Sequence, residues 1–315
     1  MRILAYVHGY PPFHNAGSEM MLHTLLSQLM MSGHKAKVLT GTGTSTEHQG
    51  VAVCTDQTEA NSLAAWCDVM ITHLDWTQRA FKLAEQVQKP LVHLIHNGFP
   101  RRYGLNDRVC DLAVFNSGTT YKACSPWKST HIVIDPLVDV NEYRTEPGEC
   151  ITLINPNSNK GVDLFYRLAE SMPYKSFLGV RGAYGDQDIR SLPNVEIIAN
   201  TADMKQVYSR TRILLMPSKF ESWGRTAIEA AASGIPTIAS HAPGLVESLD
   251  YAGVFAHRDD LESWRVAIEA LDDPDIYKAR SELARQRADE IHSQFQAHID
   301  EVEKAMLRLV RRRAR

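Results

Sequence analysis

The feature that most constrains the fold is an alternation of short apolar runs with segments of helical periodicity. Apolar runs at residues 3–7, 35–40, 69–72, 91–95, 112–115 and 131–134 predict strands, and residues 18–31 and 76–88 have helical spacing. Strands separated by helices indicate a parallel sheet that is covered by helices on both faces. The predicted fold class is therefore α/β.

The same rhythm occurs twice along the chain. Residues 135–150 hold Pro136, Pro147 and Gly148 among charged residues, which is typical of a linker. Beyond them, strands are predicted at 151–154, 177–180, 195–198, 213–216 and 237–239, with a helix at 162–171. The pattern is helical from residue 259 onwards. We therefore expect two Rossmann-like domains, at residues 1–148 and 149–290, and a terminal helix at 291–315.

Composition excludes several classes of protein. The chain has 34 basic and 37 acidic side chains, which gives a net charge of −3. This balance argues against a protein whose entire surface binds nucleic acid. Its apolar runs are far shorter than the ~18 residues of a membrane span, and its first residues are typical of a strand rather than a signal peptide. The five cysteines have no C-x-x-C spacing, so we expect free thiols and a cytoplasmic protein.

A candidate anion site lies at residues 217–236. Gly224 opens an Ala-rich helix directly after a predicted strand, so Gly224, Arg225 and Thr226 offer free backbone N–H groups, which favour a phosphate. Two carboxylates, Glu221 and Glu229, flank these groups and would accept hydrogen bonds from hydroxyls such as those of sugars. The competing interpretation is an ordinary amphipathic helix with an exposed glutamate.

This stretch resembles retaining glycosyltransferases of the GT-B fold, specifically glycosyltransferase family 4. It fits the family's frame P-S-x-x-E-x-[FW]-G-x-x-x-x-E-A-x-A-x-G-x-P, including both glutamates. The resemblance implies two domains that face a central cleft and a final helix that crosses back to the first domain. It also implies metal-independent transfer of a sugar from a UDP- or GDP-sugar to an acceptor hydroxyl. In that reaction Glu221 would orient the sugar and Glu229 would hold the ribose.

Three further segments extend the resemblance. Gly17 follows the first strand as in the family's glycine-rich loop, although Ala16 replaces the first of two adjacent glycines. His96 lies just past a strand, where the family has a histidine that reaches the transferred sugar, whereas His93 is expected in the core. Lys160 precedes the helix at 162–171, like the lysine that neutralises the donor diphosphate.

One departure affects the expected phosphate site, because Asn155 stands where the family has an arginine. Arg181, after the next strand, could supply that charge, or it could be a solvated surface residue. The predicted site has no metal, although Asp186-Gln-Asp188 resembles the metal motif of another glycosyltransferase class. The predicted catalytic residues are His96, Lys160 and Glu221, and the predicted donor-binding residues are Gly17, Arg181, Gly224, Arg225, Thr226 and Glu229.

The acceptor stays open between a glycan, a lipid, a protein and DNA. The first domain has little room for added loops, so we expect an open face that suits a macromolecule. The basic residues at 308–315 are typical of a solvated helix end, and contact with an anionic membrane surface is the second interpretation. Two rival functions are a non-catalytic nucleotide-sugar-binding subunit, which Asn155 would favour, and a nucleotide-sugar epimerase.

Overall fold

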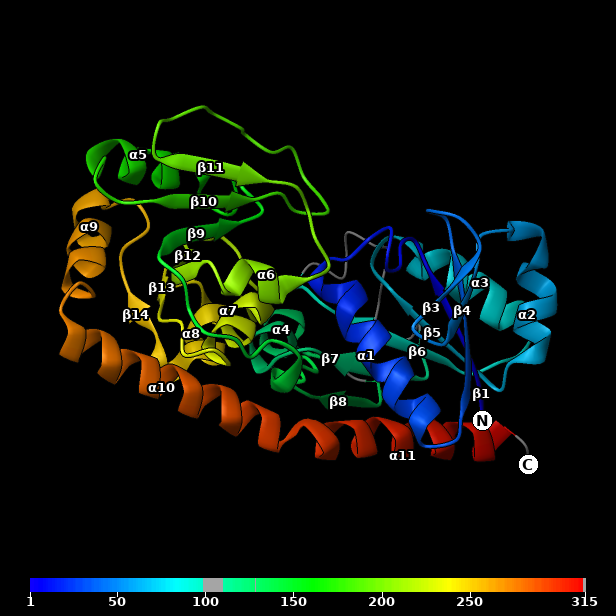
Figure 1. The fold of residues 1–315 in the computed structure, drawn as a ribbon. Coiled ribbons are helices and arrows are strands. Elements are labelled where there is room, and N and C mark those ends of the chain that lie inside the picture. Colours follow the sequence, from blue (N-terminus) through cyan, green and yellow to red (C-terminus); the bar gives the residue numbers. More distant parts are fainter. Residues whose placement is uncertain (99–109, 128, 314–315) are drawn as a thin grey trace. The chain divides into compact units, whose positions relative to one another are not determined.

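The computed structural model describes residues 1–98, 110–127 and 129–313, which form two compact units (Figure 1). Unit 1 consists of Met1–Leu137 and Phe295–Arg315, and unit 2 of Val138–Gln294. We expected the first division near residue 148. It lies earlier because Val138 and Val140 are fully buried in the core of unit 2.

Unit 1 contains a sheet of eight strands within the described part of the chain, in the order β3-β4-β2-β1-β5-β6-β7-β8. Every pair in it is parallel except β3 with β4. The strands are β1 (Arg2–Val7), β2 (Lys35–Thr40), β3 (Thr46–His48), β4 (Val51–Cys54), β5 (Val69–His73), β6 (Leu91–Ile95), β7 (Leu112–Phe115) and β8 (His131–Val133).

Helices cover both faces of this sheet. They are α1 (Gly17–Met31), α2 (Ala60–Trp66), α3 (Thr77–Gln86), α4 (Gly118–Cys124) and α11 (Phe295–Arg313). Side chains alternate along β1, so Ile3 and Val7 pack in the core under α1 and α11, while Leu4 packs on the opposite face with α2 and α3. The C-terminal helix α11 thus completes the core of unit 1, beside α1 (Figure 1).

Unit 2 contains a parallel sheet in the order β11-β10-β9-β12-β13-β14. Its strands are β9 (Cys150–Ile154), β10 (Phe177–Val180), β11 (Val195–Ile198), β12 (Thr211–Met216), β13 (Thr237–Ala239) and β14 (Val254–Phe255). Its helices are α5 (Val162–Ser171), α6 (Met204–Tyr208), α7 (Arg225–Ala231), α8 (Pro243–Leu249), α9 (Leu261–Ala270) and α10 (Pro274–Ser293). One core lies between the sheet and α7, α8 and α10, and another between the sheet and α5 and α9.

The described residues also contain four short 3-10 turns: η1 (Gln57–Glu59), η2 (Leu74–Trp76), η4 (Val140–Glu142) and η5 (Asp250–Ala252). The prediction of an α/β chain with two parallel sheets is confirmed. All five cysteines are free thiols, as expected. In the part of the chain that the structure describes, no helix has the length and apolarity needed to span a membrane.

Candidate functional site

Two loops of unit 2 meet because the strands that lead into them are neighbours. β9 and β12 pair in parallel, so the segments that follow them emerge at the same edge of the sheet. The backbone N–H of Lys219 donates to the carbonyl of Asn159 at 2.7 Å. Gly161 has a φ of +79°, and a Cβ added there would lie only 2.7 Å from the ring of Pro217. Glycine is therefore required where the two loops touch.

The meeting loops bring Lys160 and Glu221 together. The Lys160 ammonium forms an ion pair with Glu221 Oε1, which also accepts a hydrogen bond from Ser218 at 3.0 Å. Both side chains are largely buried. Burial alone would lower the pKa of Lys160, but Glu221 and Tyr184 outweigh it and the pKa is raised. Lys160 is therefore a fixed positive charge at the carboxyl edge of this sheet.

Backbone contacts hold the loop of Glu221 from a second side. Gly244, in the first turn of α8, is so close that an added Cβ would lie 2.4 Å from the carbonyl oxygen of Glu221. Gly224, directly before α7, has a φ of +92°, which favours glycine. The loop between β12 and α7 is thus fixed by two glycines, and its conformation determines where Glu221 points.

Arg225 and Glu229 form a buried ion pair on α7. Arg225 Nε donates to Glu229 Oε1 at 2.6 Å, and the hydroxyl of Tyr208 donates to Glu229 Oε2 at 2.8 Å. A second nitrogen of Arg225 donates to the hydroxyl of Tyr143 at 3.0 Å. The pKa of Tyr143 is raised to about 12, and burial is the main cause. Both oxygens of Glu229 are therefore engaged within unit 2, and its binding to ribose stays a prediction.

Three other predicted positions of unit 2 differ in exposure. Thr226 is half-buried, and its hydroxyl lies 3.8 Å from the sulfur of Met216. Arg181 is exposed directly after β10, the neighbour of β9. Asn155 is buried after β9 with a φ of +61°, a backbone conformation that asparagine tolerates better than arginine does. The asparagine thus satisfies the local backbone, and Arg181 as its replacement stays a prediction.

Unit 1 places His96 in a cluster that the sequence did not predict. His96 follows β6, and its ring lies 5.2 Å from the ring of His73, the last residue of β5. Burial lowers the pKa of His96 to about 4, so its ring is neutral at neutral pH. His93 is buried and its Nε2 lies 3.4 Å from the hydroxyl of Thr77, in agreement with a core position. Gly17 is exposed as the first residue of α1.

The centre of this cluster is Glu19, which is fully buried in the first turn of α1. Burial alone would raise the pKa of Glu19, but His14, His73 and Ser18 together lower it to about 2. A signal was present in the sequence, because His8 and His73 each end an apolar run and Glu19 follows the glycine-containing loop. Their convergence required the strand order β1-β5-β6, which the sequence does not state.

Comparisons with known proteins find glycosyltransferases among the proteins that resemble this chain. Residues 154–273 match the family described as "Glycosyl transferases group 1". An 89-residue segment is 37% identical to D-inositol 3-phosphate glycosyltransferase of Corynebacterium kroppenstedtii, covering 27% of this chain and 20% of that protein. A 147-residue segment is 26% identical to glycogen synthase of Mycobacterium tuberculosis, covering 46% of this chain and 31% of that protein. The chain thus spans less than a third of these curated relatives.

Solved structures resemble nearly the whole chain. HepE of Anabaena in complex with UDP-glucose superposes with a TM-score of 0.75 at 17% identity, covering 96% of this chain and all of HepE. Sucrose-phosphate synthase of Thermosynechococcus elongatus superposes with a TM-score of 0.72 at 15% identity, covering 98% of this chain and 99% of the synthase. An α-glucosyltransferase in complex with UDP and a 13-mer DNA superposes with a TM-score of 0.69 at 14% identity, covering 98% of this chain and 99% of that enzyme. These likenesses establish the GT-B fold.

Proposed function

We propose that the protein is a retaining glycosyltransferase that moves a sugar from a UDP- or GDP-sugar to an acceptor hydroxyl. The observation that carries the proposal is the pair Lys160–Glu221, which joins a cation and a carboxylate at the ends of β9 and β12. Such a pair suits a sugar diphosphate, which offers an anion to one partner and hydroxyls to the other. The family match over residues 154–273 covers both residues and supports the same chemistry.

In this proposal the donor breaks the ion pair between Lys160 and Glu221 and interacts with both side chains. The diphosphate draws the ammonium of Lys160, and Glu221 then accepts hydrogen bonds from the sugar hydroxyls. The leaving diphosphate gains charge in the transition state, and Lys160, Arg181 and the amides of residues 224–226 stabilise it without a metal ion. A donor phosphate oxygen takes the proton of the acceptor hydroxyl, which attacks the front face of the sugar.

Unit 1 supplies the acceptor side in the proposal. The predicted roles of His96, toward the transferred sugar, and of Gly17, where the backbone could approach the donor, stay predictions. The acceptor is macromolecular in this proposal, because the connections after β5 and β7 in unit 1 are short. One structure of similar fold has been solved with a 13-mer DNA, which supports the view that the fold can accommodate a macromolecular ligand.

Donor binding and turnover test the proposal directly. Purified protein is titrated with a panel of UDP- and GDP-sugars by calorimetry, and hydrolysis of the donor is followed by release of the nucleotide. We expect Lys160→Met to weaken donor binding by about 10- to 100-fold, because a charge-assisted contact contributes about 1.5–3 kcal/mol. We expect Glu221→Gln to lower turnover more than donor binding. The anomeric configuration of the product, read by NMR, tests retention.

Lys219→Met is the matched control, because Lys219 is an exposed lysine of the same loop as Glu221. It should leave binding and turnover unchanged. The proposal fails if no nucleotide sugar binds, or if the two lysine variants behave alike. Binding without turnover for every acceptor would instead indicate a non-catalytic subunit.

A further inference from the structure

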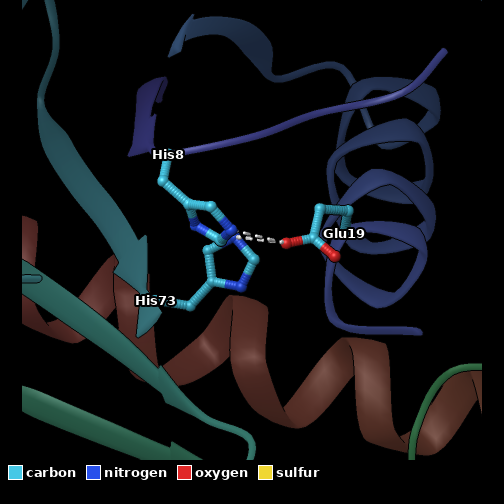
Figure 2. A group of neighbouring side chains, drawn as sticks. All are labelled: His8, Glu19 and His73. Atoms are coloured by element: carbon cyan, nitrogen blue, oxygen red, sulfur yellow. Dashed lines mark ion pairs between the residues drawn. The ribbon is translucent and has the colours of Figure 1, made fainter. Parts of the chain in front are cut away.

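Three side chains of unit 1 converge at the carboxyl edge of its sheet. His8 directly follows β1, His73 is the last residue of β5, and Glu19 lies in the first turn of α1. β1 and β5 are neighbours in the sheet, so both strands end at the same place. Figure 2 shows the two imidazoles and the carboxylate pointing toward one another from these three elements.

The distances between the three groups match an ion site. Glu19 Oε1 lies 3.5 Å from His8 Nε2 and 4.0 Å from His73 Nε2, and one ligand atom from each residue lies within 4.8 Å of the others. Two ligands of a tetrahedral zinc ion are separated by about 3.4 Å, given bonds of about 2.0–2.1 Å. Shortening these separations by up to about 1.4 Å would therefore bring all three atoms into bonding distance of one ion.

Two of these three ligand atoms, on Glu19 and His73, have unmet hydrogen-bonding capacity. Within the described residues, Glu19 Oε1 and both ring nitrogens of His73 are buried and have no hydrogen-bond partner. The other carboxylate oxygen, Oε2, accepts a hydrogen bond from Ser18 at 2.8 Å. In the described chain the ion pairs of Glu19 are formed with histidines alone: His8, His14 and His73. A buried carboxylate without a lysine or arginine partner is costly, and a bound cation would offset that cost.

We propose that His8, Glu19 and His73 bind a divalent transition-metal ion of the zinc class. Two imidazoles and one carboxylate suit Zn²⁺ or Co²⁺, whereas Mg²⁺ and Ca²⁺ prefer oxygen ligands throughout. Three protein ligands leave a coordination position open, which is the arrangement of sites that bind a further oxygen ligand. His14 and His96 border the site and are the nearest protein candidates for that position. The proposal does not depend on the proposed transferase activity.

Metal binding is tested without reference to turnover. Full-length protein is stripped with a chelator and titrated with Co²⁺, whose visible absorption reports tetrahedral nitrogen and oxygen ligands, and then with Zn²⁺ in competition. Bound zinc per chain is counted by mass spectrometry after dialysis. We expect one ion per chain, displaced by Zn²⁺ but not by Mg²⁺. Glu19→Gln and His73→Ala should each weaken binding at least about 100-fold, since loss of an outer partner alone costs 10- to 100-fold.

The controls are Glu47→Gln and His257→Ala, which change an exposed carboxylate of unit 1 and an exposed histidine of unit 2. They should bind the ion like the unchanged protein. Circular dichroism checks that each variant folds. If His73→Ala does not fold, the metal affinity of Glu19→Gln, which preserves side-chain shape, tests the proposal. Unchanged affinity in Glu19→Gln, or equal loss in the controls, overturns the proposal. Binding of the UDP- and GDP-sugar panel by the same samples shows separately whether the proposed function holds.

Discussion

At the scale of single residues, two ion pairs of unit 2 have the same spacing in the chain but different surroundings. Arg225 and Glu229 are buried on α7, with side chains 8% and 6% exposed, and each forms a further hydrogen bond with a tyrosine hydroxyl. Arg265 and Glu269 on α9 are also four residues apart, but 34% and 35% exposed. Water screens the second pair and not the first.

This contrast predicts unequal costs for the same substitution. Arg225→Met should lower the free energy of unfolding by about 3 kcal/mol, because it leaves Glu229 buried without its counter-charge. Arg265→Met should cost about 0.5 kcal/mol or less. Urea unfolding of both variants and of Arg225→Met/Glu229→Met measures this. The double variant should recover part of the loss, and equal costs for Arg225→Met and Arg265→Met would contradict the interpretation.

Residue identities and the order of motifs were readable from the sequence, whereas partners were not. The spacing from Glu221 to Glu229 and the position of Lys160 indicated a sugar-diphosphate site. The sequence did not reveal that Glu229 pairs with Arg225 and Tyr208, because Tyr208 belongs to a short helix 21 residues away. The same holds for Glu19, whose neighbour His73 is 54 residues distant and reaches it only through strand pairing (73 − 19 = 54).

At the scale of elements, the start of α8 supports the loop of Glu221. Gly244 lies against the backbone of Glu221 and Ser222, where no side chain fits. A contact between a helix and a loop backbone transmits any displacement directly, because neither side can rotate away as a flexible side chain would. The position of α8 therefore controls the position of Glu221.

Gly244→Ala should consequently impair the donor site more than the fold. The added methyl must push the loop of Glu221 aside, so we expect donor affinity to fall about 10-fold, with a loss of about 1–3 kcal/mol in unfolding free energy from overpacking. Calorimetric titration with the nucleotide sugar, beside urea unfolding, separates the two effects. Gly33→Ala is the control: its φ of +86° strains alanine, but an added Cβ there meets nothing within 4 Å. It should cost stability and leave donor affinity unchanged.

Elements with strong periodicity were predicted, and several of the shortest ones were missed. The strands at residues 112–115 and 177–180 were recovered with their exact bounds, because buried parallel strands are continuous apolar runs. The hairpin of β3 and β4 was missed, since its strands have three and four residues and β3 is largely exposed. The helices α2, α4, α6 and α8 have five to seven residues, too few for a helical period to emerge.

At the scale of the whole molecule, α11 belongs to the core of unit 1 although it follows unit 2 in the chain. Ile299, Val302 and Met306 are completely buried against the strands of that unit. Burial of three such side chains contributes about 5–9 kcal/mol, which is comparable to the entire stability of a domain. Unit 1 therefore depends on the last helix.

Truncation after Gln294 should unfold unit 1 and leave unit 2 folded. Hydrogen exchange followed by mass spectrometry is expected to show loss of protection in β1 and β5 and continued protection in β9 and β12. Truncation after Val310 is the control, because it removes the exposed Arg311, Arg312 and Arg313, of which Arg313 lies 3.4 Å from Asp111. If β1 stays fully protected from exchange in the variant truncated after Gln294, α11 is dispensable for the fold of unit 1.

The discontinuity of unit 1 also sets the order in which a growing chain can fold. Unit 2 is contiguous from Val138 to Gln294, and its sheet can close as soon as those residues leave the ribosome. Residues 1–137 are synthesised before unit 2, yet part of one apolar face of their sheet, beside α1, stays uncovered until α11 follows. The earliest part of the chain to be made is therefore the last to complete its core, and during synthesis it is the part most in need of protection from aggregation.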